Sequence, residues 1–132
     1  MLLARQLEVR LPGRWRRAVT SAEKDLVYVP DQRFSVELKT SGQRGNKIFG
    51  NRSVGQKLAD PTRSKKEKSG YFMTANFTGR TLRLLRFGWI DEADWLSQLA
   101  PTGQMSGLPT NVYAGKLMVI PGEENVPGLV EK

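Results

Sequence analysis

The chain has 132 residues, of which 39% are hydrophobic, and its 21 lysines and arginines outnumber its 13 acids to give a formal net charge of +8. It contains neither histidine nor cysteine, which excludes disulfides, thiolate metal sites, Ser-His-Asp triads and the usual zinc hydrolase sites. Any catalysis must therefore use carboxylates, lysine, tyrosine, hydroxyl groups or a metal held by oxygen ligands, such as Mg²⁺, Mn²⁺ or Ca²⁺.

The first third of the sequence predicts a β-hairpin behind a short basic segment. Residues 1–24 are basic, and their leucines fit either the spacing of a helix or the alternation of a strand. Residues 25–29 and 34–40 are rich in β-branched, aromatic and alternating apolar residues. The proline-led stretch 30–33 between them is typical of a turn, so the two strands are expected to pair as a hairpin.

The rest of the chain predicts more strands around a long polar loop. Residues 41–70 are rich in glycine, asparagine, serine and basic residues, with room for a short helix over residues 53–59. Two strands joined by a turn are expected at residues 71–77 and 81–90. They are followed by a helix over residues 92–100 that is capped by Asp91, a loop or irregular helix over residues 102–115, and a last strand over residues 116–120. We expect an α/β fold with a mainly β centre, formed by one compact domain over residues 1–132 that ends in a polar tail from about residue 121.

The stretch RFGWIDEADW has structural explanations that compete with functional ones. Alternation places Phe87 and Trp89 on one face of a strand, so core packing is favoured over stacking on bases for them and for Trp95. The three acids of the stretch offer a metal site, but helix capping and compensation of the helix dipole explain them more simply.

The strand FSVELKT, residues 34–40, carries two opposite charges inside an otherwise apolar alternation. Residues two apart share a face of a strand, so Glu37 and Lys39 point one way while the apolar residues point the other way. Asp25 lies at the start of the partner strand, and folding of the hairpin brings it near Glu37 at one end of the sheet.

Two carboxylates placed in this way suit phosphodiester hydrolysis. They can hold a hard cation such as Mg²⁺, which polarises the phosphate and lowers the pKa of a bound water. Lys39 then supplies positive charge to the developing pentavalent phosphorus or orients the attacking water. The spacing alone leaves an alternative open, which is a cross-strand ion pair on a solvated face that contributes little to stability.

The basic charge of the chain favours an anionic partner, and nucleic acid is the commonest one. A membrane surface is a weaker alternative, because the sequence has no strongly amphipathic basic helix and no apolar run long enough to span a bilayer. Basic residues crowd into one polar stretch, at Arg44, Lys47, Arg52, Lys57, Arg63, Lys65, Lys66 and Lys68. We expect this stretch to bind duplex DNA through its phosphates; the alternative is a solvated loop.

Side chains of two kinds are expected to contact DNA within this stretch. The groups suited to paired hydrogen bonds with base edges are those of Asn51, Arg52 and Gln56. For Gln56, a position facing the active site is the alternative. Contacts to phosphates are expected from Lys65, Lys66 and Lys68.

Four further stretches follow the hairpin in order: KTSGQRGNKIFGNRSVGQ, KSGYFMTANF, LLRFGWIDEADWLSQLAPTGQMSGL and VYAGKL. The hairpin with Asp25, Glu37 and Lys39 resembles the core of the PD-(D/E)xK nucleases, a superfamily that includes many restriction enzymes and repair nucleases. Together with the four stretches, over roughly residues 25–117, it resembles the ScaI-type restriction endonuclease family.

This resemblance implies a restriction-endonuclease-like fold, in which a mixed central β-sheet is flanked by helices. It implies a Mg²⁺-dependent DNA endonuclease, for which Mn²⁺ is a substitute ion, acting as a homodimer on duplex DNA. Carried over to this sequence, Asp25 and Glu37 are the metal ligands and Lys39 is the catalytic lysine. The absence of cysteine is compatible with a reducing cytoplasm, which is the expected location.

Restriction enzymes of this kind are usually longer before the hairpin than the basic segment 1–24. A minimal or non-catalytic nucleic-acid-binding module of the same fold is therefore the alternative function. A third interpretation is a structural protein–protein module whose basic charge serves solubility. Salt-dependent DNA binding distinguishes the nucleic-acid-binding module from the protein–protein module. Metal-dependent cleavage distinguishes the nuclease from both.

Overall fold

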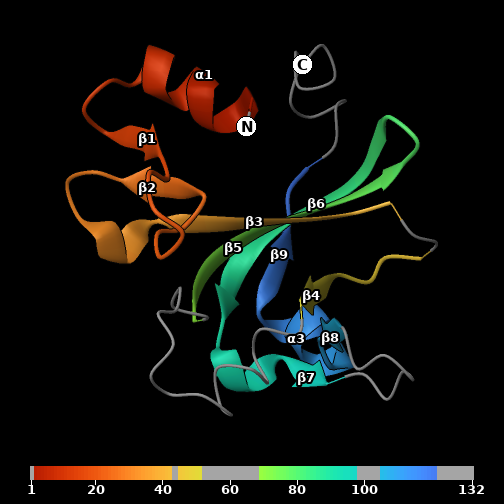
Figure 1. The fold of residues 1–132 in the computed structure, drawn as a ribbon. Coiled ribbons are helices and arrows are strands. Elements are labelled where there is room, and N and C mark those ends of the chain that lie inside the picture. Colours follow the sequence, from red (N-terminus) through yellow and green to blue (C-terminus); the bar gives the residue numbers. More distant parts are fainter. Residues whose placement is uncertain (1, 43–44, 52–68, 98–104, 122–132) are drawn as a thin grey trace.

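The computed structural model describes residues 2–42, 45–51, 69–97 and 105–121, which form two β-sheets with short helices (Figure 1). The large sheet has six strands in the order β1-β2-β3-β5-β6-β9, and the small sheet has three in the order β4-β8-β7. The strands of the large sheet are β1 (Trp15–Arg17), β2 (Leu26–Tyr28), β3 (Val36–Ser41), β5 (Gly70–Thr78), β6 (Thr81–Ile90) and β9 (Leu117–Val119). The other elements are β4 (Phe49–Asn51), β7 (Leu96–Ser97), β8 (Met105–Gly107), the α-helices α1 (Leu2–Arg10) and α3 (Thr110–Gly115), and the 3-10 helices η1 (Gln32–Phe34) and η2 (Glu92–Asp94). The predicted α/β class with a mainly β centre is confirmed.

The long hairpin of β5 and β6 forms the centre of the large sheet. Buried and half-buried residues alternate along β5, as expected of a strand whose two faces meet different layers. Gly79 turns the chain with a φ of +59°, a conformation that glycine adopts without steric cost. Because β3 pairs with β5 in parallel and β6 pairs with β5 antiparallel, the sheet is mixed, as predicted.

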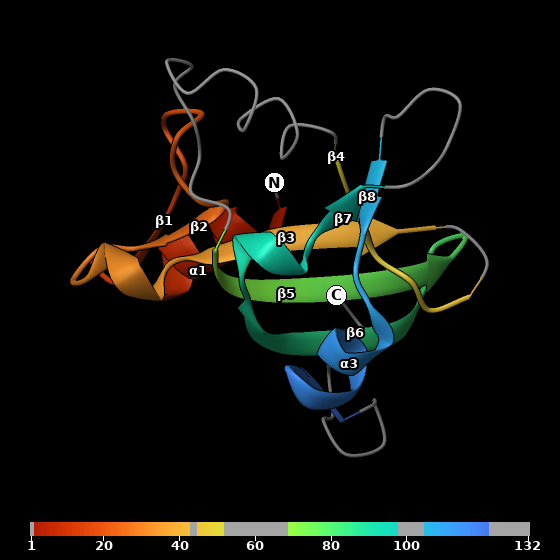
Figure 2. The ribbon, with the colours of Figure 1, turned by 90° about the horizontal axis from the view of Figure 1, so that it is seen from below.

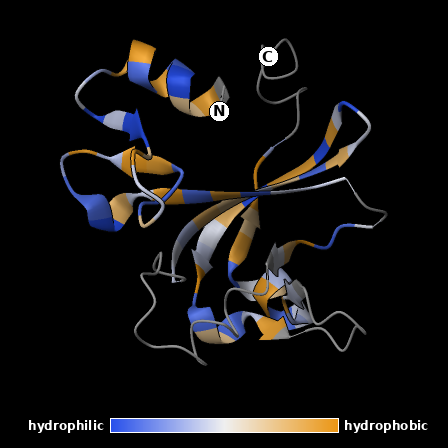
Figure 3. Cartoon of the chain, viewed as in Figure 1, coloured by the Kyte–Doolittle hydropathy of each residue, from blue (hydrophilic) through white to orange (hydrophobic). Residues whose placement is uncertain are grey.

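Helix α1 covers part of one face of the large sheet, which we call the outer face. Ala4 of α1 packs with Leu26 and Val36 in a buried cluster, and half-buried Leu38 and Tyr71 pack against it. Figure 3 shows both hydrophobic and hydrophilic residues on α1, as expected of a helix with one covered side. Of the two alternatives for the first leucines, the helix is the correct one.

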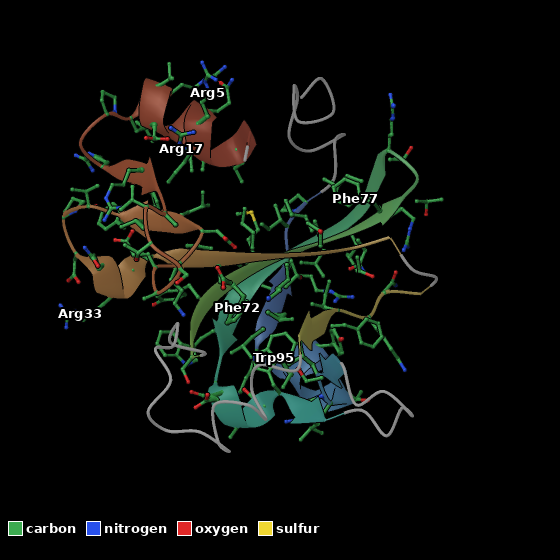
Figure 4. The ribbon with its side chains drawn as sticks, in the orientation of Figure 1. Arg5, Arg17, Arg33, Phe72, Phe77 and Trp95 are labelled. Carbon is green, nitrogen blue, oxygen red and sulfur yellow. The ribbon has the colours of Figure 1, made fainter. Side chains whose placement is uncertain are left out.

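The small sheet and α3 lie over the opposite face, which we call the inner face (Figures 1 and 2). A buried cluster on this side joins Ile48, Phe72, Ile90, Trp95 and Val112. The rings of Phe72 and Trp95 lie 5.7 Å apart between centroids, and Figure 4 shows both side chains below the large sheet. Among the described residues, the layer over this face consists of α3 and the three short strands of the small sheet, so strand pairing supplies more of it than the expected helices do.

The predicted helix over residues 92–100 is wrong for its described part. The 3-10 helix η2 is followed by strand β7, which pairs with β8. Packing of Trp95 against Phe72 draws the chain across the inner face, and strand pairing replaces helical hydrogen bonds there. Residues 98–100 and the predicted short helix over residues 53–59 lie outside the described residues.

The five strands predicted from the sequence are present as β2, β3, β5, β6 and β9. Strand β3 begins at Val36 rather than at residue 34, because η1 occupies the end of the predicted turn. The strands β1, β4, β7 and β8, of two or three residues each, were not predicted. Among the described residues, no helix has the length and hydrophobicity needed to cross a membrane.

Core packing is confirmed for two of the three aromatic residues of the stretch around β6. Trp95 is buried, and Phe87 is half-buried against the α1 cluster. Trp89 is 43% exposed and donates a 2.9 Å hydrogen bond from its indole N–H to the Asp91 carboxylate, so its prediction as a core residue is wrong.

Candidate active site

The two predicted metal-binding carboxylates meet where the pairing of β2 and β3 ends. Leu26 pairs with Val36, so Asp25 and Glu37 occupy the next positions outward. The Asp25 backbone N–H donates a 3.0 Å hydrogen bond to Oε1 of Glu37, and the Leu38 backbone N–H donates a 2.9 Å hydrogen bond to Oδ2 of Asp25. The Glu37 carboxylate thus accepts from the main chain of Asp25, and the Asp25 carboxylate accepts from the main chain of the residue after Glu37. We call this pair of carboxylates the carboxylate clasp.

The clasp holds its side chains in a defined geometry. Glu37 is buried, with 6% of its surface exposed, whereas Asp25 and Lys39 are half-buried. A carboxylate in such a place requires donors or cations around it, and the Asp25 backbone provides one donor. The clasp also provides acceptors for the backbone N–H groups of Asp25 and Leu38, at the point where the pairing of β2 with β3 ends. The end of the β2–β3 pairing and the geometry of the site therefore share these two hydrogen bonds.

Strand β3 presents Glu37 and Lys39 on the inner face, because Val36 packs in the α1 cluster on the outer face. In the parallel register with β5, Glu37 lies beside Phe72 and Lys39 lies beside Thr74. The predicted alternation of this strand is confirmed. The structure thus places the clasp and Lys39 on one face of the sheet, with Lys39 two residues beyond Glu37 along β3.

Lys24 is a second lysine at this end of the sheet, which the sequence reasoning missed. Its ammonium nitrogen donates a 2.8 Å hydrogen bond to the carbonyl oxygen of Ser69 and lies 5.7 Å from the centroid of the Phe72 ring. Since Phe72 pairs with Glu37, Lys24 reaches the inner face near the clasp. The signal in the sequence was its position directly before Asp25.

Three buried polar residues in β5 and β6 were also missed. Thr74 and Asn76 of β5 are fully buried, and Arg86 of β6 is 6% exposed. The registers place Lys39, Thr74 and Arg86 in one row across β3, β5 and β6. The alternation of YFMTANF contained a signal, because it places two polar residues on the same face as Phe72.

Of the predicted DNA-binding residues, Lys47 and Asn51 fall in the described part of the chain. Lys47 is exposed in the segment before β4, and Asn51 is the last residue of β4. The others lie outside the described residues: Arg44, Arg52, Gln56, Lys65, Lys66 and Lys68. The DNA contacts of this stretch therefore stay predictions.

The clasp has a donor set that fits a hard divalent cation. Carboxylate oxygens are preferred ligands of Mg²⁺, and its sites in enzymes acting on phosphates commonly use one or two carboxylates together with water and substrate phosphate. Within the described ranges, no three or more acidic side chains gather as a metal site. Asp25 and Glu37 would therefore hold such an ion together with ligands from beyond the described residues, such as water and substrate phosphate.

Structural contacts account for the acids after β6. The Asp91 backbone N–H donates a 2.9 Å hydrogen bond to Oδ2 of Asp94. Nζ of Lys116 lies 2.9 Å from Oδ2 of Asp91 and 2.6 Å from Oδ2 of Asp94. The Lys116 hydrogen bond, followed by the one from Trp89, lowers the pKa of Asp91. These contacts fix the chain between β6 and β7, which favours the structural explanation over a metal site.

The segment that leads into the clasp contains an ion pair that makes stability depend on pH. Arg16 donates hydrogen bonds to both carboxylate oxygens of Glu23, and the Val19 backbone N–H donates a third at 2.9 Å. The Arg16 hydrogen bond is the main cause that lowers the pKa of Glu23 from 4.5 to about 2. Because the folded-state pKa is lowered, the stability from this pair is present above the unfolded-state pKa and is lost as the pH falls toward the folded-state pKa.

We therefore expect Glu23→Gln to unfold at a lower urea concentration than the wild type near neutral pH. The difference should shrink steadily as the pH falls below about 4.5, where the unfolded chain begins to take up the proton. Urea unfolding followed by tryptophan fluorescence at a series of pH values measures this difference. A gap between the two proteins that stays constant down to pH about 3 would contradict the lowered pKa of Glu23.

Comparison with known proteins places these residues in a known family. The family model of the ScaI restriction endonuclease matches residues 1–121, a range that includes Asp25, Glu37 and Lys39. The type II restriction enzyme ScaI of Streptomyces caespitosus is 44% identical over 114 residues, which cover 80% of this chain and 49% of that relative. The chain thus spans about half the length of the curated relative it matches. No solved structure matches the chain significantly. The chain belongs to the ScaI restriction endonuclease family.

Proposed function

We propose that the chain is a metal-dependent endonuclease that hydrolyses phosphodiester bonds in duplex DNA, as type II restriction enzymes do. The observation that carries this proposal is the carboxylate clasp of Asp25 and Glu37 at the start of the strand that also bears Lys39. Membership of the family supports the same class of reaction. The mixed sheet with its site at one end supports a restriction-endonuclease-like fold.

Mg²⁺ is the proposed cofactor, with Mn²⁺ as a substitute, and Asp25 and Glu37 are the proposed ligands. When bound, the ion would supply Lewis acidity to the scissile phosphate and to the attacking water. The two carboxylates attract the cation by their charge. Their hydrogen bonds to the main chain fix their orientation before any cation arrives, so binding requires little rearrangement.

Lys39 is the proposed catalytic lysine. Its ammonium group brings positive charge from the inner face of β3 to the phosphate, where it stabilises the negative charge that develops during attack. An ammonium group has only hydrogen-bond donors, so it also orients the attacking water through the water oxygen. The water loses a proton to solvent and forms a new bond to phosphorus, the bond from phosphorus to the 3′ oxygen breaks, and that oxygen takes up a proton from solvent. The products are a 3′-hydroxyl and a 5′-phosphate.

Duplex DNA is the proposed substrate because the net charge of +8 favours an anionic partner. The proposed contacts to DNA are Arg44, Lys47, Asn51, Arg52, Gln56, Lys65, Lys66 and Lys68. Lys47 is exposed on a segment that follows the strand of Lys39, which supports its role. A homodimer is the proposed active form, since two copies related by a two-fold axis match the two strands of a duplex. The cytoplasm is the proposed place of action.

Incubation of the purified chain with long duplex DNA of mixed sequence, in Mg²⁺, in Mn²⁺ and in EDTA, tests this function. Cleavage that requires a metal ion is the expected result, and discrete bands on a gel would add sequence specificity. DNA of several base compositions keeps a rare recognition site from hiding the activity. DNA that is bound in low salt but stays intact with every metal would favour the non-catalytic binding module.

A further inference from the structure

Side chains hold a short segment after β3 to the large sheet. Four consecutive backbone carbonyls, those of residues 45–48, each accept a hydrogen bond from a side chain. The pairs are Arg83 with Gly45 at 2.8 Å, Arg86 with Asn46 at 2.9 Å, Asn76 with Lys47 at 3.0 Å and Tyr113 with Ile48 at 3.3 Å. We call residues 45–48 the clamped segment, and Asn76, Arg83 and Arg86 the polar clamp.

Arg86 is the buried cation of the polar clamp. Its guanidinium carbon lies 4.8 Å from the centroid of the Tyr113 ring, and burial lowers the pKa of Arg86. Within the described part of the chain, its Nη1 atom is buried without a hydrogen-bond partner, as are Oδ1 of Asn76 and Oγ1 of Thr74. The charge of Arg86 is thus held by a carbonyl and a ring face.

Burial of a charge in such surroundings carries a desolvation cost. A buried charge with incomplete hydrogen bonding is often less stable than an apolar side chain of similar volume. The unpartnered atoms of Thr74 and Asn76 add to the cost, since buried polar groups are normally satisfied. Positions that break packing rules in this way are expected where the geometry serves function rather than stability.

The clamped segment is tied to the strand row that contains the catalytic lysine. The registers align Arg86 with Lys39 two strands away, and neighbouring strands lie about 4.8 Å apart. The hydrogen bond from Arg86 therefore holds the Asn46 carbonyl at a strand position that is level with Lys39. Asn76, at the next inner-face position of β5, fixes the carbonyl of Lys47.

We propose that the polar clamp positions the clamped segment so that Lys47 meets the DNA at a fixed distance from Lys39. This inference rests on the proposed function, because it takes duplex DNA as the partner of Lys47. Arg83 and Arg86 are positioning residues in this role and make no DNA contact themselves. The β5–β6 hairpin then sets the alignment of the DNA backbone with the catalytic lysine, since a rigid strand pair supplies the anchors.

A double-mutant cycle on DNA affinity tests the positioning role. Binding of a fluorescent duplex is measured by anisotropy in EDTA for the full chain with Arg86→Met, with Lys47→Met and with both changes. Arg86→Met alone is expected to weaken binding about fivefold, because Lys47 loses its fixed position. In the Lys47→Met background the same change is expected to weaken binding less than about twofold, because the residue through which it acts is gone.

Arg83→Met repeats the cycle at an exposed position, where loss of the side chain is not expected to unfold the protein. The matched control is Arg80→Met, which removes the same charge from an exposed turn of the same hairpin and should have equal, small effects in both backgrounds. The stability of each variant is measured by urea unfolding. Arg86→Met is expected to be at least as stable as the wild type.

Equal losses of affinity in both backgrounds for Arg86→Met and Arg83→Met would overturn the positioning role, because they would indicate independent DNA contacts. No loss in either background, or a loss that follows reduced stability, would overturn it as well. A wild type that binds no duplex at low salt would overturn the proposed DNA function itself, which distinguishes the two failures.

Discussion

Glu37→Gln is expected to abolish metal-dependent DNA cleavage and to weaken Mn²⁺ binding by about a hundredfold or more, while the chain stays folded. Glutamine keeps an oxygen that can accept from the Asp25 N–H and has nearly the same shape. It has no charge with which to hold a hard cation. Calorimetric titration with Mn²⁺ measures the loss of binding, and a gel assay on duplex DNA measures the loss of cleavage.

Glu8→Gln is the matched control for this prediction. It makes the same chemical change on α1, where Glu8 pairs with Arg17 at 2.7 Å. We expect this variant to bind Mn²⁺ and cleave DNA as the wild type does. Wild-type Mn²⁺ affinity in Glu37→Gln would contradict the role of Glu37 as a metal ligand, whatever the effect on cleavage.

Lys39→Met is expected to slow cleavage by about a thousandfold and to leave Mn²⁺ affinity nearly unchanged. Methionine fills similar space on the inner face but brings no positive charge to the phosphate. The proposed ligands, Asp25 and Glu37, keep their hydrogen bonds to the main chain. Single-turnover cleavage at saturating protein measures the chemical step apart from DNA binding.

The separation of binding from chemistry is the critical feature of the Lys39 prediction. Arg80→Met removes one positive charge from an exposed turn and is expected to cleave at the wild-type rate. Cleavage by Lys39→Met at the wild-type rate would contradict the proposed role of Lys39. Lys24, whose ammonium lies on the inner face near the clasp, would then be the next residue to test.

Strand-forming residues on either side of a turn predicted the centre of the fold. Residues 71–77 and 81–90 are rich in apolar and aromatic residues and form β5 and β6 within one residue of the predicted bounds. The hairpin of Asp25 and Glu37 was also predictable, because two charges interrupt an apolar pattern at positions that share a face. The structure brings these residues together, whereas their catalytic and metal-binding roles stay proposals.

The inner layer was not predicted, because its strands are too short to show a period. Strands β4, β7 and β8 have two or three residues each and depend on pairing with one another. The helix expected over residues 92–100 is wrong for its described part, residues 92–97, for a related reason. Its acidic start is typical of a helix, but burial of Trp95 and pairing with β8 decided the local structure.

Contacts between distant parts of the sequence explain why the polar clamp and Lys24 were missed. Arg86 binds a carbonyl 40 positions away, and Lys24 binds one 45 positions away. No local pattern in a single sequence reports such pairs. A buried arginine in a strand gives only the hint that some distant group must accept its hydrogen bonds.

The position of a bound metal ion tests the proposed site most directly. Crystals of the chain with duplex DNA and Mn²⁺, measured at a wavelength where manganese scatters anomalously, would locate the ion. The predicted result is one Mn²⁺ within coordination distance of the carboxylates of both Asp25 and Glu37, with the Lys39 ammonium facing the adjacent phosphate. Manganese bound to the DNA and to other residues, with both clasp carboxylates bound to no ion, would contradict the site.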